Sequence, residues 1–227
     1  MNDNDLSAVS GPLRFQILPS GIISCNAVVL WHEQTRDAVL IDPTDDAKGV
    51  IAFARERERE LSVHHVLLTH GHFDHAADAE RAMTEFSCPA SVHDDDLSLY
   101  RDIPNHALLF GLRVSPRTLP IGRLADEQII EFLPGYPIEV RHTPGHSAGS
   151  VAFCVANAAW TFSGDTLFNE SVGRTDLPGG SSKSITSSIR NRLYSLPDET
   201  LVIPGHGPMT TIGHEKRHNQ FVRLATL

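Results

Sequence analysis

Four side chains that can bind a metal ion are packed into six residues of this chain: His70, His72, Asp74 and His75. They come directly after a short apolar segment that reads as a strand. On a strand or a helix these side chains could not all point one way, but in a turn they can diverge, and Gly71 permits a tight backbone there. Burying so many polar groups without a metal would be costly. The natural division gives two ligands to each of two ions, His70 and His72 to the first and Asp74 and His75 to the second.

Each ion then needs a third ligand, and three candidates lie further along the chain. His146, Asp165 and His206 each follow a predicted strand and stand beside a glycine, where the backbone can approach an ion closely. A lone histidine near a strand end is more often a core or surface residue, but the cluster at 70–75 makes ligation the favoured interpretation for these three. Other histidines lack such support and are assigned to core, surface or outer positions: His93, His106 and His142.

This set of ligands predicts hydrolytic chemistry. Imidazole and carboxylate groups suit zinc, iron and manganese alike, with zinc the favoured assignment. A bound divalent ion can lower the pKa of water to about 7, which makes hydroxide available near neutral pH. Two ions about 3.5 to 4 Å apart can share that hydroxide and polarise the oxygen under attack, with Asp165 bridging them and Asp74 orienting the nucleophile. The chain is therefore predicted to use a metal-bound hydroxide on an ester, thioester, amide or phosphodiester.

Predicted strands and helices occur in both halves of the chain. Apolar segments bounded by turn residues predict strands at 13–18, 22–31, 38–41, 63–69, 90–93, 138–142, 150–155, 159–163 and 201–204. Helical patterns cover 47–60, 77–86, 182–194 and 213–224. The segment 94–123 reads as a long irregular connection, and the alternating charges at 55–60 as the solvated face of a helix. This order predicts a layered α/β architecture with the site at strand ends.

The composition is ordinary for a globular protein. Of the 227 residues, 41% are hydrophobic and 21% are charged. A net charge of -9 gives no electrostatic reason to expect a nucleic acid or an anionic membrane as partner. Glycine-rich nucleotide-binding patterns are absent from the sequence, which weakens nucleotide-dependent functions. The expected partner is a small molecule.

The three cysteines are odd in number, far apart and set among apolar residues: Cys25, Cys88 and Cys154. This pattern is neither a disulfide framework nor a cysteine zinc site, and it indicates buried small hydrophobes in a reducing compartment. Residues 1–11 lack the features of a signal peptide, and no segment approaches the roughly 20 apolar residues of a membrane helix. The expected location is the cytoplasm.

The motifs occur in a recognisable order along the chain. They are His-x-His-x-Asp-His at 70–75, Thr-Pro-Gly-His-Ser at 143–147, Gly-Asp-Thr-Leu-Phe at 164–168 and Pro-Gly-His-Gly at 204–207. Together with Leu-Ile-Asp-Pro at 40–43, they closely resemble the metallo-β-lactamase superfamily over residues 15–218. The resemblance implies a four-layer αββα sandwich of two similar halves in a single domain, 1–227, with a dinuclear site along one edge.

Two further segments, 173–178 and 205–215, look most like the short glyoxalase II-like hydrolases. That resemblance implies hydrolysis of S-D-lactoylglutathione, or of a related hydroxyacyl thioester, to a free acid and a thiol. It also implies a ligand set, with His70, His72 and His146 on the first ion, Asp74, His75 and His206 on the second, and Asp165 bridging.

The chain departs from these relatives in two ways. Full-length glyoxalase II carries a C-terminal helical domain that helps to hold glutathione, and this chain is expected to lack it. Gly179-Gly180 stands where the short relatives commonly have an Asp after a Gly. Arg174 falls near a basic residue that contacts glutathione in glyoxalase II, so it is either a binder of substrate carboxylate or a structural partner of Asp176.

Several alternatives share the same fold. Persulfide dioxygenases have a Gly-Arg-Thr-Asp segment too, but use one iron and oxidise their substrate, and they typically replace 205–208 with an Ala-His-Asp type segment, which favours the hydrolase here. A hydrolase of other small esters is a further alternative, as is a binding module in which the metals only staple the fold. A β-lactamase fits poorly with the absent export signal, and a nuclease with the acidic balance and the lack of an added substrate-binding arm.

Overall fold

The computed structural model describes residues 6–56 and 60–224. The first half of the chain contains β1 (Ser7–Ser10), β2 (Leu13–Ser20), β3 (Cys25–His32), β4 (Asp37–Ile41), α1 (Lys48–Arg55), β5 (Ser62–Leu67), α2 (Phe73–Ala76), α3 (Ala79–Phe86), β6 (Ala90–His93), η1 (Asp94–Asp96), α4 (Leu97–Arg101), α5 (Ile103–Leu108) and β7 (Gly122–Leu124). The second half contains β8 (Ile129–Ile130), β9 (Ile138–His142), β10 (Val151–Val155), η2 (Ala156–Ala158), β11 (Trp160–Gly164), β12 (Leu167–Phe168), β13 (Ser171–Val172), α6 (Ser182–Ser188), η3 (Ile189–Leu193), β14 (Leu201–Pro204), β15 (Thr210–Thr211) and α7 (Ile212–His218).

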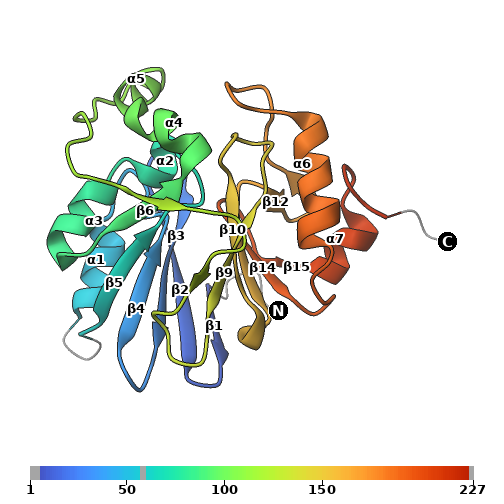
Figure 1. Ribbon diagram of the computed structural model, residues 1–227, viewed down its shortest axis with the longest axis horizontal. Helices are drawn as coiled ribbons and strands as arrows, with labels where there is room; N and C mark the ends of the chain where they lie inside the picture. Colours follow the sequence, from blue (N-terminus) through green and yellow to red (C-terminus); the bar gives the residue numbers. More distant parts are fainter. Residues whose placement is uncertain (1–5, 57–59, 225–227) are drawn as a thin grey trace.

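Within the described residues the strands form two main sheets with helices on their outer sides (Figure 1). The first sheet has the order β1-β2-β3-β4-β5-β6-β7, and the second has the order β15-β14-β11-β10-β9-β8. Helices α1 and α3 flank the first sheet, and α6 and α7 flank the second on the opposite side of the molecule (Figure 1). The predicted αββα sandwich is therefore confirmed.

The inner faces of the two sheets pack against each other through a buried apolar layer. Along β2, buried Leu13, Phe15 and Ile17 alternate with partly exposed residues, as expected for a strand with one face in the core. The ring of Phe15 makes edge contacts with Trp160 and Phe162 of β11, at centroid distances of 4.9 and 5.7 Å. Burying an apolar side chain of this kind stabilises the folded state by roughly 1.5 to 3 kcal/mol. This layer holds the two halves of the sandwich together.

The direction of the strands places several loops at one edge of the sandwich. Strands β4, β5 and β6 are parallel neighbours, so their carboxyl ends share an edge. In the second sheet β9 and β11 both run antiparallel to β10, and β14 runs parallel to β11. The segments that follow β9, β11 and β14 therefore also emerge together.

The prediction of an irregular connection over 94–123 is wrong, because the segment contains η1, α4, α5 and β7. Its short helices bury Tyr100, Ile103 and Ala107 against the apolar cluster of the first sheet. Helices this short give little periodic signal of their own, and tertiary packing stabilises them.

Two predicted helices are shorter than expected. Helix α1 ends at Arg55, and residues 57–59 of the predicted helix and of the charge run lie outside the described residues. Helix α7 ends at His218 rather than at 224. Within the described part of the chain, no helix combines the length and the apolar character needed to cross a membrane.

Candidate metal centre

The fold brings the predicted ligands together at one edge of the sandwich. Four lie after β5 and at the start of α2: His70, His72, Asp74 and His75. Three follow strands of the second sheet: His146 after β9, Asp165 after β11 and His206 after β14. All are buried except His206, whose side chain is 24% exposed. A site on strand ends, as the sequence analysis expects, places these side chains on rigid supports.

Three histidines form the first group: His70, His72 and His146. Nδ1 of His72 lies 2.8 Å from Nε2 of His146, and the His70 ring centroid is 4.8 Å from each of the other two rings. Nε2 of His70 is buried and has no hydrogen-bond partner among the described residues. A buried nitrogen without a partner is costly unless a ligand satisfies it. This group therefore fits a divalent metal ion.

Hydrogen bonds on the far side of the rings fix which nitrogen faces the group. Nδ1 of His146 donates to the backbone carbonyl of Arg174 at 2.9 Å, which leaves Nε2 with its lone pair. Nδ1 of His70 donates to the Thr69 hydroxyl at 3.0 Å, and that hydroxyl donates to Asp42 at 2.6 Å. Such outer partners orient metal-binding imidazoles and raise their basicity.

Burial keeps the first group in the form that binds metals. Burial lowers the pKa of His70 well below its usual value, and the neighbouring histidines lower it further. Burial also lowers the pKa of His72 to about 3. Both imidazoles are consequently neutral at pH 7, as a metal ligand must be.

The second group combines imidazole and carboxylate side chains. Nε2 of His75 lies 3.3 Å from Oδ2 of Asp74 and 3.3 Å from Oδ1 of Asp165. Nε2 of His206 lies 3.2 Å from Oδ2 of Asp74. Nδ1 of His75 donates to Asp42 at 2.9 Å, so the nitrogen that faces the carboxylates is Nε2. Mixed imidazole and carboxylate donors are typical ligands of zinc, iron and manganese.

Asp165 faces both groups. Its Oδ1 lies 3.3 Å from Nε2 of His75 in the second group. Its Oδ2 lies 3.5 Å from Nε2 of His146 in the first group. A carboxylate in this position can bridge two neighbouring cations.

The charges of the second group favour a cation at this point. Burial raises the pKa of Asp74, but the charges of His75 and His206 and their hydrogen bonds outweigh it, and the net pKa lies well below the usual value. Burial lowers the pKa of His75, yet the charges of Asp74, Asp165 and Asp42 raise it well above the usual value. In the absence of a metal, a proton supplies the positive charge that these aspartates favour.

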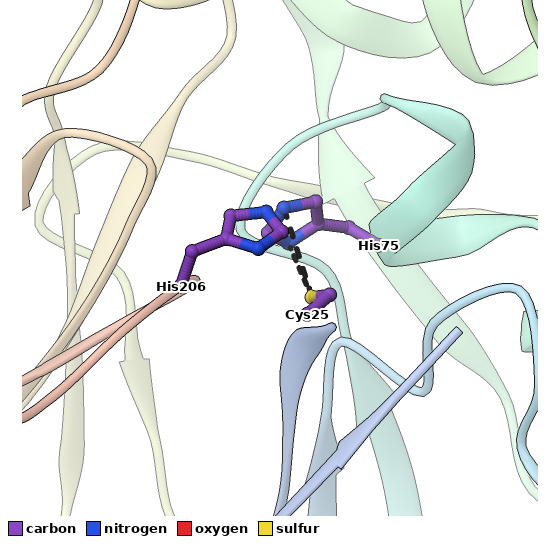
Figure 2. A group of neighbouring side chains, drawn as sticks. All are labelled: Cys25, His75 and His206. Atoms are coloured by element: carbon purple, nitrogen blue, oxygen red, sulfur yellow. Dashed lines mark hydrogen bonds between the residues drawn. The ribbon is translucent and has the colours of Figure 1, made fainter. Parts of the chain in front are cut away.

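Cys25 lies against this second group, which the sequence analysis did not foresee (Figure 2). Its Sγ is 3.4 Å from Nδ1 and 3.7 Å from Nε2 of His75, and its backbone pairs with that of His206. Burial raises the pKa of the Cys25 thiol to about 12. Cys25 is buried, as predicted, but it contacts two candidate ligands rather than only apolar neighbours.

Asp96 is a functional candidate that the sequence analysis missed. Its buried carboxylate accepts hydrogen bonds from Gly71, Ser147 and Gly149, so it contacts both loops that carry the first group. The sequence shows only three successive aspartates at 94–96. Nothing in that run distinguishes the buried member from its exposed neighbours.

The three unassigned histidines lie outside the two groups. His93 and His142 stack face to face at a centroid distance of 4.1 Å and an interplanar angle of 11°, close to Asp95. Nε2 of His142 donates to the backbone carbonyl of Ala148 at 2.9 Å. Parallel rings direct their lone pairs side by side rather than toward one point, so this pair is a poor metal site. His106 instead lies beside the first group, with its ring centroid 4.9 Å from that of His72.

The position of Arg174 is compatible with both of the roles considered for it. Arg174 lines the cavity beside the two groups. It also makes a two-pronged ion pair with Asp176, in which Nε and Nη2 each lie 2.8 Å from a carboxylate oxygen. Both side chains of this ion pair are exposed. The charge of Arg174 is therefore already matched by Asp176 where Arg174 lines the cavity.

Comparisons with known proteins agree with this geometry. The family model described as the metallo-beta-lactamase superfamily matches residues 21–206. The chain is 35% identical over 211 residues to the hydroxyacylglutathione hydrolase GloC of Haemophilus influenzae, across 92% of this chain and 98% of that protein. It is also similar to the solved structure of the BLEG-1 B3 metallo-beta-lactamase, with 36% identity and a TM-score of 0.84 over 92% of this chain and 99% of that one.

Two further solved structures are similar in sequence and fold. TTHA1623 in a di-iron-bound form is 39% identical, with a TM-score of 0.81 over 90% of this chain and 98% of that one. ETHE1 from Myxococcus xanthus is 26% identical, with a TM-score of 0.74 over 92% of this chain and 84% of that one. Together with the family match over most of its length, these similarities show that the chain is an enzyme of the metallo-beta-lactamase superfamily.

Proposed function

We propose that this chain is a thioester hydrolase with two metal ions, zinc being the first candidate metal and S-D-lactoylglutathione the first candidate substrate. The observation that carries the proposal is the position of Asp165, whose two oxygens face the two groups of potential ligands. The similarity to a hydroxyacylglutathione hydrolase supports the substrate class. The proposed ligands of the first ion are His70, His72 and His146, and those of the second are Asp74, His75 and His206, with Asp165 between them. We expect the enzyme to act in the cytoplasm.

Two divalent ions held by these residues would supply an activated water near neutral pH and would polarise a carbonyl oxygen. Asp74 lines the cavity, and because its pKa is low its carboxylate is ionised at neutral pH. It therefore accepts a hydrogen bond from the attacking water and holds that water toward the substrate carbonyl. As the water oxygen bonds to the carbonyl carbon, the carbon–sulfur bond breaks. The products are a free acid and a thiol, and the water supplies the thiol proton.

The test is turnover of S-D-lactoylglutathione beside a panel of small esters, on protein whose metals have been quantified. We expect about two divalent ions per chain and faster hydrolysis of the thioester than of the esters. Faster hydrolysis of an ester would assign the enzyme to other small esters. If the protein unfolds when its metals are removed but hydrolyses none of these substrates when its metals are bound, it is a binding module whose fold the metals stabilise.

The second candidate is a persulfide dioxygenase with one iron, and the 26% identity to ETHE1 supports it. The two candidates differ in metal count and in co-substrate. About one iron per chain, together with oxygen uptake on glutathione persulfide, would replace the hydrolase proposal.

A further inference from the structure

The cavity beside the candidate metal centre has apolar walls. Its volume is about 430 Å³, within the range of small-molecule sites. Residues of both metal-binding groups line one part of it. The rest is lined chiefly by apolar side chains from separate segments of the chain: Ile23, Phe73, Phe110, Phe168 and Leu177.

An aromatic wall connects the candidate ligands to the surface. Phe73 follows His72 in the chain and is almost fully buried. Its ring centroid lies 4.8 Å from that of Phe110, which is 46% exposed. A molecule that reaches the metal-binding groups along this wall therefore passes the rings of Phe73 and Phe110 and the imidazole of His106.

Two apolar residues at the mouth of the cavity come from distant parts of the sequence. Ile23 lies between β2 and β3, and Phe110 lies after α5. Their side chains are 44% and 46% exposed. Exposed apolar groups gathered at a groove are characteristic of ligand-binding surfaces. Their direct neighbours Ile22 and Leu109 are exposed as well, but they do not line the cavity.

The cavity offers few positively charged side chains to a substrate with several carboxylates. Glutathione carries two carboxylates, whereas Arg174 is the single lysine or arginine that lines the cavity among the described residues. The guanidinium of Arg174 is already paired with both oxygens of Asp176.

We infer that the preferred substrates are uncharged thioesters with an apolar acyl chain of about four to eight carbons, which the cavity can enclose. Ile23 and Phe110 are then the residues that select for the length of the chain. This inference rests on the proposed thioester hydrolase function and narrows its substrate class. It ranks uncharged acyl thioesters above S-D-lactoylglutathione, the candidate that the similarity to a hydroxyacylglutathione hydrolase supports.

The first experiment compares kcat/KM for acetyl, butanoyl, hexanoyl and octanoyl thioesters of N-acetylcysteamine, an uncharged thiol, with that for S-D-lactoylglutathione. Burial of one methylene group is worth about 0.8 kcal/mol, so we expect kcat/KM to rise roughly threefold to fourfold for each methylene up to six carbons. We expect the hexanoyl thioester to exceed S-D-lactoylglutathione.

Two pairs of neighbouring substitutions identify the selecting residues. Phe110→Ala and Ile23→Ala remove cavity walls, whereas Leu109→Ala and Ile22→Ala remove neighbouring apolar groups that are more exposed and do not line the cavity. We expect each wall variant to lower kcat/KM about tenfold for the hexanoyl thioester and less than twofold for the acetyl thioester. The neighbouring variants should retain the wild-type dependence on chain length.

A binding measurement separates this inference from the proposed function. The hexyl thioether of N-acetylcysteamine cannot be hydrolysed, so its binding can be measured by calorimetry. We expect the wild type to bind it more tightly than the methyl thioether. We expect the Phe110→Ala variant to bind the two thioethers equally. Chain-length-dependent binding without turnover of any thioester would overturn the proposed hydrolysis and support the apolar site. Turnover of S-D-lactoylglutathione with no rise in kcat/KM along the acyl series would support the hydrolase and overturn this inference.

Discussion

The Asp96 carboxylate accepts a hydrogen bond of 2.6 Å from the hydroxyl of Ser147. The same oxygen accepts the backbone N–H of Gly71 at 2.9 Å, and the other oxygen accepts that of Gly149 at 2.7 Å. Gly71 lies between two histidines of the first group, and Ser147 directly follows the third. One buried carboxylate thus ties together the two loops that position the proposed ligands of the first ion.

This relationship predicts that Asp96→Asn weakens metal binding without removing a ligand. The new amide sets a donor against N–H and O–H donors, so we expect a loss of about 1 to 3 kcal/mol in unfolding free energy. Metal affinity should fall roughly tenfold to a hundredfold, as for other partners that orient ligands. Urea unfolding and competition with a chelator measure the two effects. Asp95→Asn is the matched control because the Asp95 side chain is 58% exposed, and equal losses in both variants would contradict the role assigned to Asp96.

Asp165→Ala and His72→Ala are each expected to lose metal and activity together. Each removes a proposed ligand, so the fall in metal affinity should exceed about a hundredfold. Elemental analysis after dialysis, alongside thioester turnover, gives both readouts on one sample. His214→Ala serves as the control, since this histidine pairs with Glu170 at an exposed position and belongs to neither group. Normal turnover by the His72→Ala enzyme would refute the assignment of ligands.

Arg174→Ala is expected to raise KM for S-D-lactoylglutathione by roughly fivefold, because among the described residues Arg174 supplies the one guanidinium that lines the cavity and can meet a substrate carboxylate. Uncharged small esters should show little change. Asp176→Ala, which frees the guanidinium from its ion pair, should lower the same KM. Steady-state kinetics give KM for S-D-lactoylglutathione and for the small esters. An equal change in both KM values would assign Arg174 a structural role alone.

The stability of the metal-free protein is expected to fall as pH rises above neutrality. His75 has a raised pKa, so its contribution to stability is fully present below its usual value of 6.5 and is lost as pH rises through the folded value. Asp74 has a lowered pKa, so its contribution is present above its usual value of 3.8 and is lost as pH falls through the folded value. Both contributions coexist between these two values.

Urea unfolding of chelator-treated protein from pH 5 to pH 9 tests this profile. The unfolding free energy of the wild type should decline at the alkaline end of that range. The decline should be smaller in His75→Gln, which has no imidazole at position 75 to titrate, while His206, whose pKa is also raised, still contributes. An identical decline in the variant would show that other groups cause it.

Much of the fold and of the candidate site could be predicted from the sequence. Strands such as 138–142 and 201–204 were predicted with their observed bounds, because their apolar residues are contiguous and turn residues mark their ends. The order of predicted strands and helices indicated a layered α/β architecture, and the resemblance of the motifs to the metallo-β-lactamase superfamily implied the αββα class. Short helices within 94–123 were missed, since a single turn or two of helix carries too few residues to show a period.

The sequence by itself determined which side chains are available as ligands, because the dense run at 70–75 and the strand-end residues stand out locally. Only the tertiary structure decided that Asp165 faces both groups, that Cys25 contacts His75, and that Asp96 joins two loops. The walls of the cavity, with Ile23 near Phe110, were decided in the same way. The physical reason is that these contacts join residues far apart in the chain, whereas sequence periodicity reports only whether a residue is buried within its own strand or helix.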